Sequence, residues 1–340
     1  MLHISLSGTP RERGLVHGES YRKQIHELLE LAKSKFLHSI KLDEANVFLD
    51  RMFLYTKLHE PELVEEMESI GKAASVDLQD IFLLHAVSAL SSFGPNCTNI
   101  TVQDSADGPL LGKTSDIGED YSYYMLQQTT THDGQRFIAA GWVGTVWMEV
   151  GMNHHGFVVG QSSGPIAPEQ DGSGLPTLLC PRPLLTRCRN VPEAIAYLQD
   201  RRMAGRGLNM MLLDREGNNA VVEKSGSYQS VRAATDEILF CTNHFLSQEM
   251  KDFRGLGMPG IEENSRSRFS YLLNTASTKP AVSLNQRQLQ ELLRSHEGHI
   301  CQHDDPDLTT HYAFIAAPRQ LEFMVTEGNP CENEFLSYRL

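Results

Sequence analysis

Apolar side chains in the first 95 residues recur at the spacing of an α-helix. Two stretches show it most clearly: Ile25, Leu28, Leu29, Ala32 and Phe36, and then Leu63, Met67, Ile70 and Ala74. Apolar residues three and four positions apart lie on one helix face, where they can be buried together. Strand-prone runs are scarce here, so we expect this part of the chain to be almost wholly helical up to a break at 93–96.

From residue 98 the chain changes to short β-prone runs separated by Asp-Gly and other turns. The first strands are expected at 98–103, 110–114, 125–132 and 135–143, and as a pair within 151–161. A helix follows, with Asn190 and Glu193 at the spacing of a capping box. The next β-prone runs are expected to form a second antiparallel sheet, with strands at 210–213, 220–223, 228–232 and 238–241.

The remaining expected elements are helices at 265–273 and 284–294 and strands at 312–316 and 321–325. Strands do not alternate singly with helices, so the pattern favours a layered α+β domain, with sheets packed face to face under helices, over a doubly wound sheet. No long linker rich in Pro, Gly or Ser divides the chain. Residues 1–340 are therefore expected to form a single structural unit.

The charge balance argues against some classes of partner. The 340 residues include 30 Lys and Arg against 43 Asp and Glu, which gives a formal net charge of −13. No basic cluster is longer than Arg201-Arg202, so no nucleic-acid partner is expected. An apolar stretch at 81–90 is well short of the roughly 20 residues of a membrane helix, and no signal peptide is visible. We therefore expect no membrane partner and a cytoplasmic location.

Six cysteines are scattered without a CxxC pair, so a disulfide framework is not expected. One of them, Cys97, lies where the helical segment ends and the first strand begins. A thiol there can attack the carbonyl of Asn96, and hydrolysis of the ester-like bond makes Cys97 a new N-terminus. Its α-amine, with a pKa of about 7.7–8.0, can take the thiol proton without a catalytic histidine. From position alone, a buried structural cysteine remains the more common interpretation.

Further motifs surround Cys97 in an order that spans almost the whole chain. They are Gly8-Thr9-Pro10-Arg11-Glu12-Arg13-Gly14 with His17-Gly18, Asn96-Cys97-Thr98, 110–116, 151–156, 209–214 with Glu223, Thr242-Asn243-His244, 265–268, 295–301 and 328–331. With these motifs the chain resembles the acyl-coenzyme A:6-aminopenicillanate acyltransferase-like family of N-terminal nucleophile hydrolases, peptidase group C45.

The resemblance implies a four-layer αββα N-terminal nucleophile hydrolase sandwich with a helical N-terminal segment. It also implies autocatalytic cleavage between Asn96 and Cys97. The products would be an α segment, residues 1–96, and a β segment, residues 97–340, which stay together as a heterodimer.

Four catalytic positions follow from the resemblance. The nucleophile falls on Cys97, and Asp116 matches the carboxylate that holds the new α-amine. Asn243 matches the amide of the oxyanion hole, and Arg268 matches the arginine that closes the site, with Arg266 as an alternative. The other interpretations of these residues are a solvated turn Asp, an Asn that turns the chain, and surface-helix arginines.

Two positions depart from the bile-salt hydrolases related to this family. Lys113 stands where those enzymes usually carry an arginine, and a lysine lacks the bidentate fork of a guanidinium. Ser163 stands where they carry a second oxyanion asparagine. These departures weaken any transfer of substrate preference, and they leave Lys113 and Ser163 as candidate substrate-binding residues.

Aromatic residues near Asp116 are candidates for lining an acyl or amine pocket. They are Tyr121, Tyr123, Tyr124, Trp142 and Trp147, of which Tyr123 and Trp147 are our candidate substrate-binding residues. The alternative is that they belong to the core, because aromatic side chains in strands more often do.

Histidines and cysteines crowd one segment: His296, His299, Cys301 and His303. Imidazole and thiolate are good zinc ligands, but a structural site usually draws ligand pairs from two separated segments. Because these four residues lie within one short stretch, the sequence favours a structural loop. Neither a metal nor another cofactor is expected.

The leading interpretation is a self-processing cysteine amidohydrolase that cleaves a small-molecule N-acyl amide through a thioester at Cys97. The first alternative is an acyltransferase that moves the acyl group from a thioester or an amide to an amine. A metallohydrolase built on residues 296–303 and a non-catalytic scaffold of the same fold are the others. The Asn96-Cys97 junction and Asp116 argue against the scaffold.

Overall fold

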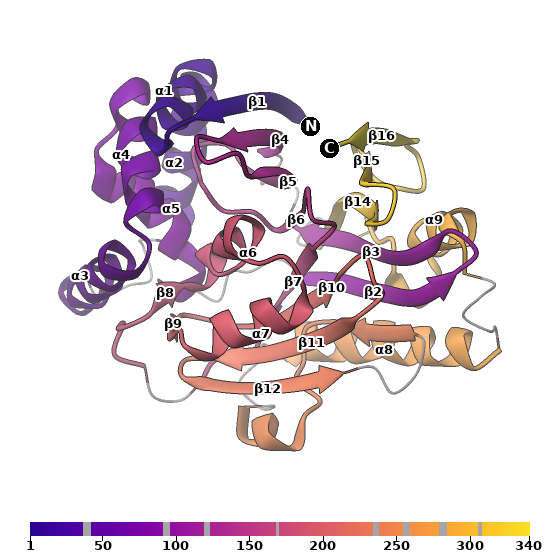
Figure 1. Ribbon diagram of the computed structural model, residues 1–340. Helices are drawn as coiled ribbons and strands as arrows, with labels where there is room; N and C mark the ends of the chain where they lie inside the picture. Colours follow the sequence, from indigo (N-terminus) through magenta and orange to yellow (C-terminus); the bar gives the residue numbers. More distant parts are fainter. Residues whose placement is uncertain are drawn as a thin grey trace.

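The computed structural model describes residues 1–36, 42–90, 96–118, 123–167, 170–233, 238–253, 259–278, 284–304 and 308–340. Two β-sheets pack face to face, and helices cover both outer faces (Figure 1). Apolar cores join α6 and α7 to the first sheet, the first sheet to the second, and the second sheet to α8 and α9. The expected four-layer αββα sandwich is therefore confirmed.

The N-terminal helices gather at one side of the molecule (Figure 1). In chain order, the helices are α1 (Pro10–Ser20), α2 (Arg22–Phe36), α3 (Leu42–His59), α4 (Pro61–Ala74), α5 (Leu78–Leu90), α6 (Pro181–Arg187), α7 (Val191–Gln199), α8 (Pro259–Thr278) and α9 (Gln286–Leu293). Within the described ranges, no helix has both the length and the apolar character needed to cross a bilayer.

The first sheet has the strand order β1-β4-β5-β6-β7-β10-β11-β12, and the second has β13-β2-β3-β14-β15-β16. The strands of the first are β1 (Leu2–Gly8), β4 (Tyr124–Thr131), β5 (Arg136–Trp142), β6 (Val150–Asn153), β7 (Val158–Gly164), β10 (Gly207–Leu213), β11 (Asn219–Ser225) and β12 (Tyr228–Ala233). Those of the second are β13 (Ile238–Cys241), β2 (Asn96–Ser105), β3 (Gly108–Ile117), β14 (Thr309–Ala317), β15 (Glu322–Thr326) and β16 (Phe335–Arg339). A short parallel pair is formed by β8 (Leu175–Pro176) and β9 (Met203–Ala204).

Local signals predict many of these elements correctly. Strand β13 covers the residues expected from the sequence, and α7 begins at the expected cap, where Asn190 Oδ1 accepts the Glu193 N–H at 2.9 Å. Residues 93–95 of the expected break at 93–96 lie outside the described residues, and Asn96 begins β2.

Two expectations about strands are wrong, and one strand lies outside the expected set. Residues 2–8 form a strand, β1, which pairs in parallel with β4, although the first 95 residues are expected to be almost wholly helical. Its alternation of apolar Leu2, Ile4 and Leu6 with polar residues is the signal of a strand with one buried face. The runs at 210–233 do not form a second sheet but extend the first, while β13 pairs with β2 in the other sheet. Strand β16 was not expected.

Two buried histidines tie the N-terminal helices to the loop after β5. His17 Nε2 in α1 accepts the Gly144 N–H at 2.9 Å, and His85 Nε2 in α5 accepts the Val146 N–H at 2.9 Å. Gly144 has a φ of 73°, and a Cβ there would lie 2.9 Å from Ile25, so this loop needs glycine. Burial lowers the pKa of both imidazoles to about 4. Both rings are therefore neutral in the folded chain at pH 7.

We expect the folded chain to lose stability as the pH falls below the ordinary histidine pKa of about 6.5. Between that value and about 4 the unfolded chain binds protons that His17 and His85 do not. Each histidine should lower the free energy of unfolding by about 2 kcal/mol between about pH 7.5 and about pH 5. Urea unfolding of an uncut Cys97→Ala chain measures this loss. His17→Gln and His85→Gln should each reduce the pH dependence, and an unchanged slope in both variants would contradict the assignment.

Candidate active site

The hairpin of β2 and β3 places the candidate nucleophile. The two strands pair antiparallel, with Cys97 opposite Ser115 and Asn96 opposite Asp116. Because side chains alternate between the two faces of a strand, Cys97 points to the opposite face from its neighbours Asn96 and Thr98. The thiol contacts Glu149, the residue just before β6 of the facing sheet, while the next side chain, Thr98, contacts Arg268 of α8.

The Cys97 thiol lies in a closed polar cluster between the sheets. It donates to Glu149 Oε1 at 3.2 Å and accepts from Lys113 Nζ at 3.0 Å. Lys113 Nζ also lies 2.8 Å from Glu149 Oε1, and neither side chain is exposed to solvent. Ser115 Oγ and the Tyr312 hydroxyl donate to the same carboxylate at 2.8 and 2.6 Å. The Glu149 carboxylate therefore contacts all four of these side chains.

Burial raises the pKa of the Cys97 thiol well above its usual range, and the nearby carboxylates of Glu149 and Asp116 raise it further. The positive charge of Lys113 lowers the pKa of the thiol, but by less than burial and the two carboxylates raise it. The thiol is therefore protonated in the uncut chain near pH 7. Burial by itself lowers the pKa of Lys113, but its interactions with Cys97 and Glu149 act the other way and leave it raised. Lys113 is therefore a buried cation.

The backbone of Cys97 is held by a second set of groups. Its N–H donates to Asn243 Oδ1 at 3.0 Å, and its carbonyl accepts from Arg268 Nη1 at 2.6 Å. Arg268 Nη2 also donates to Asn243 Oδ1, at 2.7 Å. Asn243 is fixed in turn by its own N–H, which donates to Ser265 Oγ in α8 at 2.7 Å. Both sides of the Cys97 main chain are thus clamped.

Asp116 lies on the α8 side of the second sheet. Its carboxylate accepts from Thr310 Oγ1 at 2.7 Å and from Gln302 Nε2 at 3.0 Å. Burial raises the pKa of Asp116, and the positive charge of Arg268 is the strongest influence in the other direction. Asp116 is thus next to the strand residue, Asn96, that contributes the carbonyl side of the candidate cleavage bond.

The structure separates the two candidate arginines and locates Ser163. Arg268 is fully buried at Cys97, whereas Arg266 pairs with Glu262 on the exposed side of α8. Ser163 contributes its main-chain carbonyl, which accepts from Asn243 Nδ2 at 3.0 Å.

The candidate aromatic residues occupy different places. Trp147 is buried in the core between the sheets, edge-to-face with Trp142 at 4.9 Å, and Tyr123 is half-buried at the rim of that core. Tyr124 lies in the cluster, because its hydroxyl is 3.0 Å from Ser115 Oγ. Tyr121 lies outside the described residues.

Sequence reasoning missed Glu149 and Tyr312. Glu149 had a usable signal, because it is the one charged residue in the apolar run 137–152. A charge in such a run is buried only with a partner. Tyr312 is one aromatic residue among several in a β-prone stretch, so nothing local distinguishes it.

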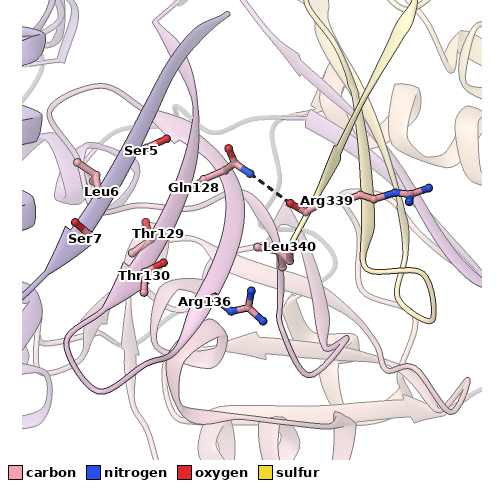
Figure 2. Close-up of a pocket in the computed structure, with 9 residues that line it drawn as sticks. All are labelled: Ser5, Leu6, Ser7, Gln128, Thr129, Thr130, Arg136, Arg339 and Leu340. Carbon is pink, nitrogen blue, oxygen red and sulfur yellow. Dashed lines mark hydrogen bonds between the residues drawn. The ribbon is translucent and has the colours of Figure 1, made fainter.

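A surface pocket of about 340 Å³ lies elsewhere, between β1, β4 and the C-terminal residues. Figure 2 shows it, with Gln128 Nε2 donating to the Arg339 carbonyl across one side. Its lining shares no residue with the groups around Cys97. The Cys97 side chain itself has no exposed surface. The thiol is therefore closed off from solvent in this structure.

Comparison with known proteins identifies relatives. The family described as acyl-coenzyme A:6-aminopenicillanic acid acyl-transferase matches residues 103–330. The structure of an N-acylethanolamine-hydrolyzing acid amidase ortholog from Caenorhabditis elegans is similar with a TM-score of 0.50 and 13% identity, covering 66% of this chain and 93% of that chain. A mutant of the conjugated bile acid hydrolase from Clostridium perfringens has a TM-score of 0.47 and 13% identity, covering 72% of this chain and 97% of that chain. No curated protein matches. At 13% identity the amidase ortholog shows likeness of fold alone.

Proposed function

Because this chain belongs to the acyl-coenzyme A:6-aminopenicillanic acid acyl-transferase family, whose enzymes act on C–N bonds, we propose that it is a self-processing cysteine amidohydrolase. It would cleave a small-molecule N-acyl amide through a thioester at Cys97. One observation carries the proposal. The thiol, N–H and carbonyl of Cys97 are each bound by a different polar side chain at the start of a central strand.

The self-cleavage needs a base before any free α-amine exists. Cys97 Sγ donates to Glu149 Oε1 at 3.2 Å, so Glu149 is placed to take the thiol proton. The sulfur then attacks the Asn96 carbonyl carbon, the C–N bond to Cys97 breaks, and Glu149 returns the proton to the leaving amine. Water hydrolyses the thioester, which frees the thiol and leaves a carboxylate on Asn96. Lys113, 3.0 Å from the sulfur, stabilises the transient thiolate.

In the matured enzyme the α-amine of Cys97 takes over as base, because the ordinary pKa of an α-amine, about 7.7–8.0, lies near neutral pH. Asp116 would orient this amine and favour its protonated form. Asn243 would supply an oxyanion donor. Its side-chain Nδ2, which donates to the Ser163 carbonyl at 3.0 Å, would donate to the oxyanion of the tetrahedral intermediate.

Burial of Cys97 explains why the cut would precede turnover. In the uncut chain Asn96 occupies the position next to the sulfur that a substrate acyl group must take. Departure of the Asn96 carboxylate would open that position. The uncut chain should therefore be inactive on external amides.

The two products of the cut would remain together. Strand β1 pairs with β4 along its whole length, from Leu2 opposite Met125 to Gly8 opposite Thr131. Helices α2 and α5 also contribute to the core between the two sheets. The shorter product would thus contribute strand β1 to a sheet, and helices α2 and α5 to a core, that residues 97–340 otherwise form.

Intact-mass measurement of the purified active protein tests this proposal. We expect two co-purifying chains with the masses of residues 1–96 and 97–340. When the protein is mixed with N-acyl amides or acyl thioesters and the reaction is quenched rapidly, the mass of the longer chain should increase by one acyl group, bound at Cys97. Full activity in a chain that is continuous across Asn96-Cys97 would overturn the mechanism.

The same experiment separates hydrolysis from acyl transfer, which the family name raises as the second candidate. An amine acceptor added with the acyl donor competes with water for the thioester. Formation of the N-acylated amine in preference to the free acid would assign the chain as an acyltransferase.

A further inference from the structure

Four metal-binding side chains meet on the α8 side of the molecule, away from the thiol cluster. They are His296, Cys301, His303 and Cys331, and their ligand atoms all lie within 4.8 Å of one another. Cys331 Sγ is 3.4 Å from His303 Nε2, and the rings of His296 and His303 are nearly perpendicular with centroids 4.9 Å apart. Two imidazoles and two thiols thus converge on one point.

This grouping differs from the one that the sequence presents. His299 lies close by in the chain but outside the cluster, and its φ of 60° belongs to a tight turn. In its place the fold brings in Cys331, from the turn between β15 and β16. The ligands now come from two separated segments, which removes the objection that all candidates crowd one stretch.

We propose that His296, Cys301, His303 and Cys331 bind a single structural zinc ion. Zinc takes four tetrahedral Cys and His ligands in structural sites, with bonds of about 2.3 Å to sulfur and about 2.0–2.1 Å to nitrogen. Such a site spaces its ligand atoms about 3.3–3.8 Å apart. The observed separations of 3.4 Å and at most 4.8 Å need a contraction of only about 1 Å. All four positions are filled by protein, so the ion has no open position for catalysis.

The ion would clamp the segment that supports Asp116. Gln302 lies between two of the ligands, Cys301 and His303, and its Nε2 donates to Asp116 at 3.0 Å. The main chain of Gln302 is bonded to Thr310, whose N–H donates to the Gln302 carbonyl at 2.6 Å. Fixing residues 301 and 303 therefore fixes the Gln302 side chain. The zinc assignment stands without the proposed function, and only this consequence for Asp116 rests on it.

Gln302 also connects to the clamp on the Cys97 main chain. Its Oε1 accepts from Asn264 Nδ2 at 2.9 Å, and Asn264 Oδ1 accepts from Arg268 Nε at 2.8 Å. Arg268 in turn holds the Cys97 carbonyl. The side chain of Gln302 thus links the proposed ion to Asp116 and, through Asn264, to Arg268.

Metal analysis of the Cys97→Ala chain tests the site without depending on self-cleavage. The protein is purified under reducing conditions without metal-affinity resin, and zinc is measured by mass spectrometry. We expect about one zinc ion per chain. Cobalt(II) added to the apoprotein should give the intense visible bands of a tetrahedral thiolate complex. Cys331→Ser, in a half-buried turn, should lose both signals, and so should Cys301→Ser.

Two matched controls should keep the metal. His299→Asn changes the neighbouring histidine and tolerates its left-handed backbone, and Cys188→Ser changes a buried cysteine in another layer. Amide hydrogen exchange of residues 301–304 and 308–310 should quicken when a chelator removes the ion, while β12 stays unchanged.

Three results would overturn the proposal. The first is reduced protein that takes up neither zinc nor cobalt. The second is equal uptake by wild type, Cys301→Ser and Cys331→Ser. The third is a disulfide between Cys301 and Cys331 in freshly purified, metal-free protein. If the protein binds zinc but removal of the ion leaves hydrogen exchange of residues 301–304 and 308–310 unchanged, the proposed effect of the ion on Gln302 would be wrong.

Discussion

The Cys97→Ala chain should remain a single polypeptide of 340 residues with no measurable turnover. Alanine has neither a nucleophile to attack the Asn96 carbonyl nor a sulfur to carry an acyl group. Because the cut cannot occur, the α-amine that serves as base is never released. Intact mass and an amide-hydrolysis assay measure the two losses separately. Cys97→Ser should cut slowly, since a hydroxyl can make the same acyl shift but is a poorer nucleophile.

Cys241→Ala is the matched control for this loss. Cys241 is also buried, and it lies in β13, which pairs directly with β2. Its removal leaves a small cavity near Cys97 but does not touch the nucleophile. The variant should cut and turn over as wild type does. If it lost activity while remaining folded, Cys97 would not be the nucleophile.

Glu149→Gln should slow the self-cleavage by about 10²–10⁴-fold, the usual contribution of a general base. Glutamine keeps the shape of the side chain and can still accept from Lys113, but it cannot hold the thiol proton. The rate is measured by intact mass at intervals after refolding from urea. A Glu149→Gln chain that cuts at the wild-type rate would remove Glu149 from the mechanism.

A second variant separates this role from a purely structural one. Glu149→Gln leaves Lys113 as a buried cation without its counter-charge, which by itself costs about 3–5 kcal/mol of stability. The double variant Glu149→Gln with Lys113→Met removes both charges and should regain much of that stability. Because Lys113 also stabilises the transient thiolate, the reference for the rate is Lys113→Met alone. If Glu149 is the base, the double variant cuts more slowly than Lys113→Met. Recovery of the rate together with the stability would show that Glu149 only balances Lys113.

Helices and most strands could be predicted from the sequence because their signals are local. The apolar spacing of residues 63–74 is that of α4, and Asn190 caps α7 through a contact with the third residue after it. Strand β1 shows a local alternation of apolar and polar residues, but its pairing could not be predicted from that alternation. Strand β1 is stabilised by β4, more than a hundred residues later, and nothing within residues 2–8 reveals that partner. The division of strands between sheets also depends on such distant pairing.

Within the candidate site, the sequence alone determined the position of Cys97 at the boundary between helix and strand. Through the resemblance it also singled out Asp116, Asn243 and Arg268, whose roles stay predictions. Only the tertiary structure decided which other groups surround the thiol. It places Glu149 at the Cys97 thiol, Arg268 and not Arg266 at the Cys97 carbonyl, and Cys331 beside His303. The reason is that a buried charge or ligand needs partners, and those partners come from strands and turns that meet only when the two sheets pack.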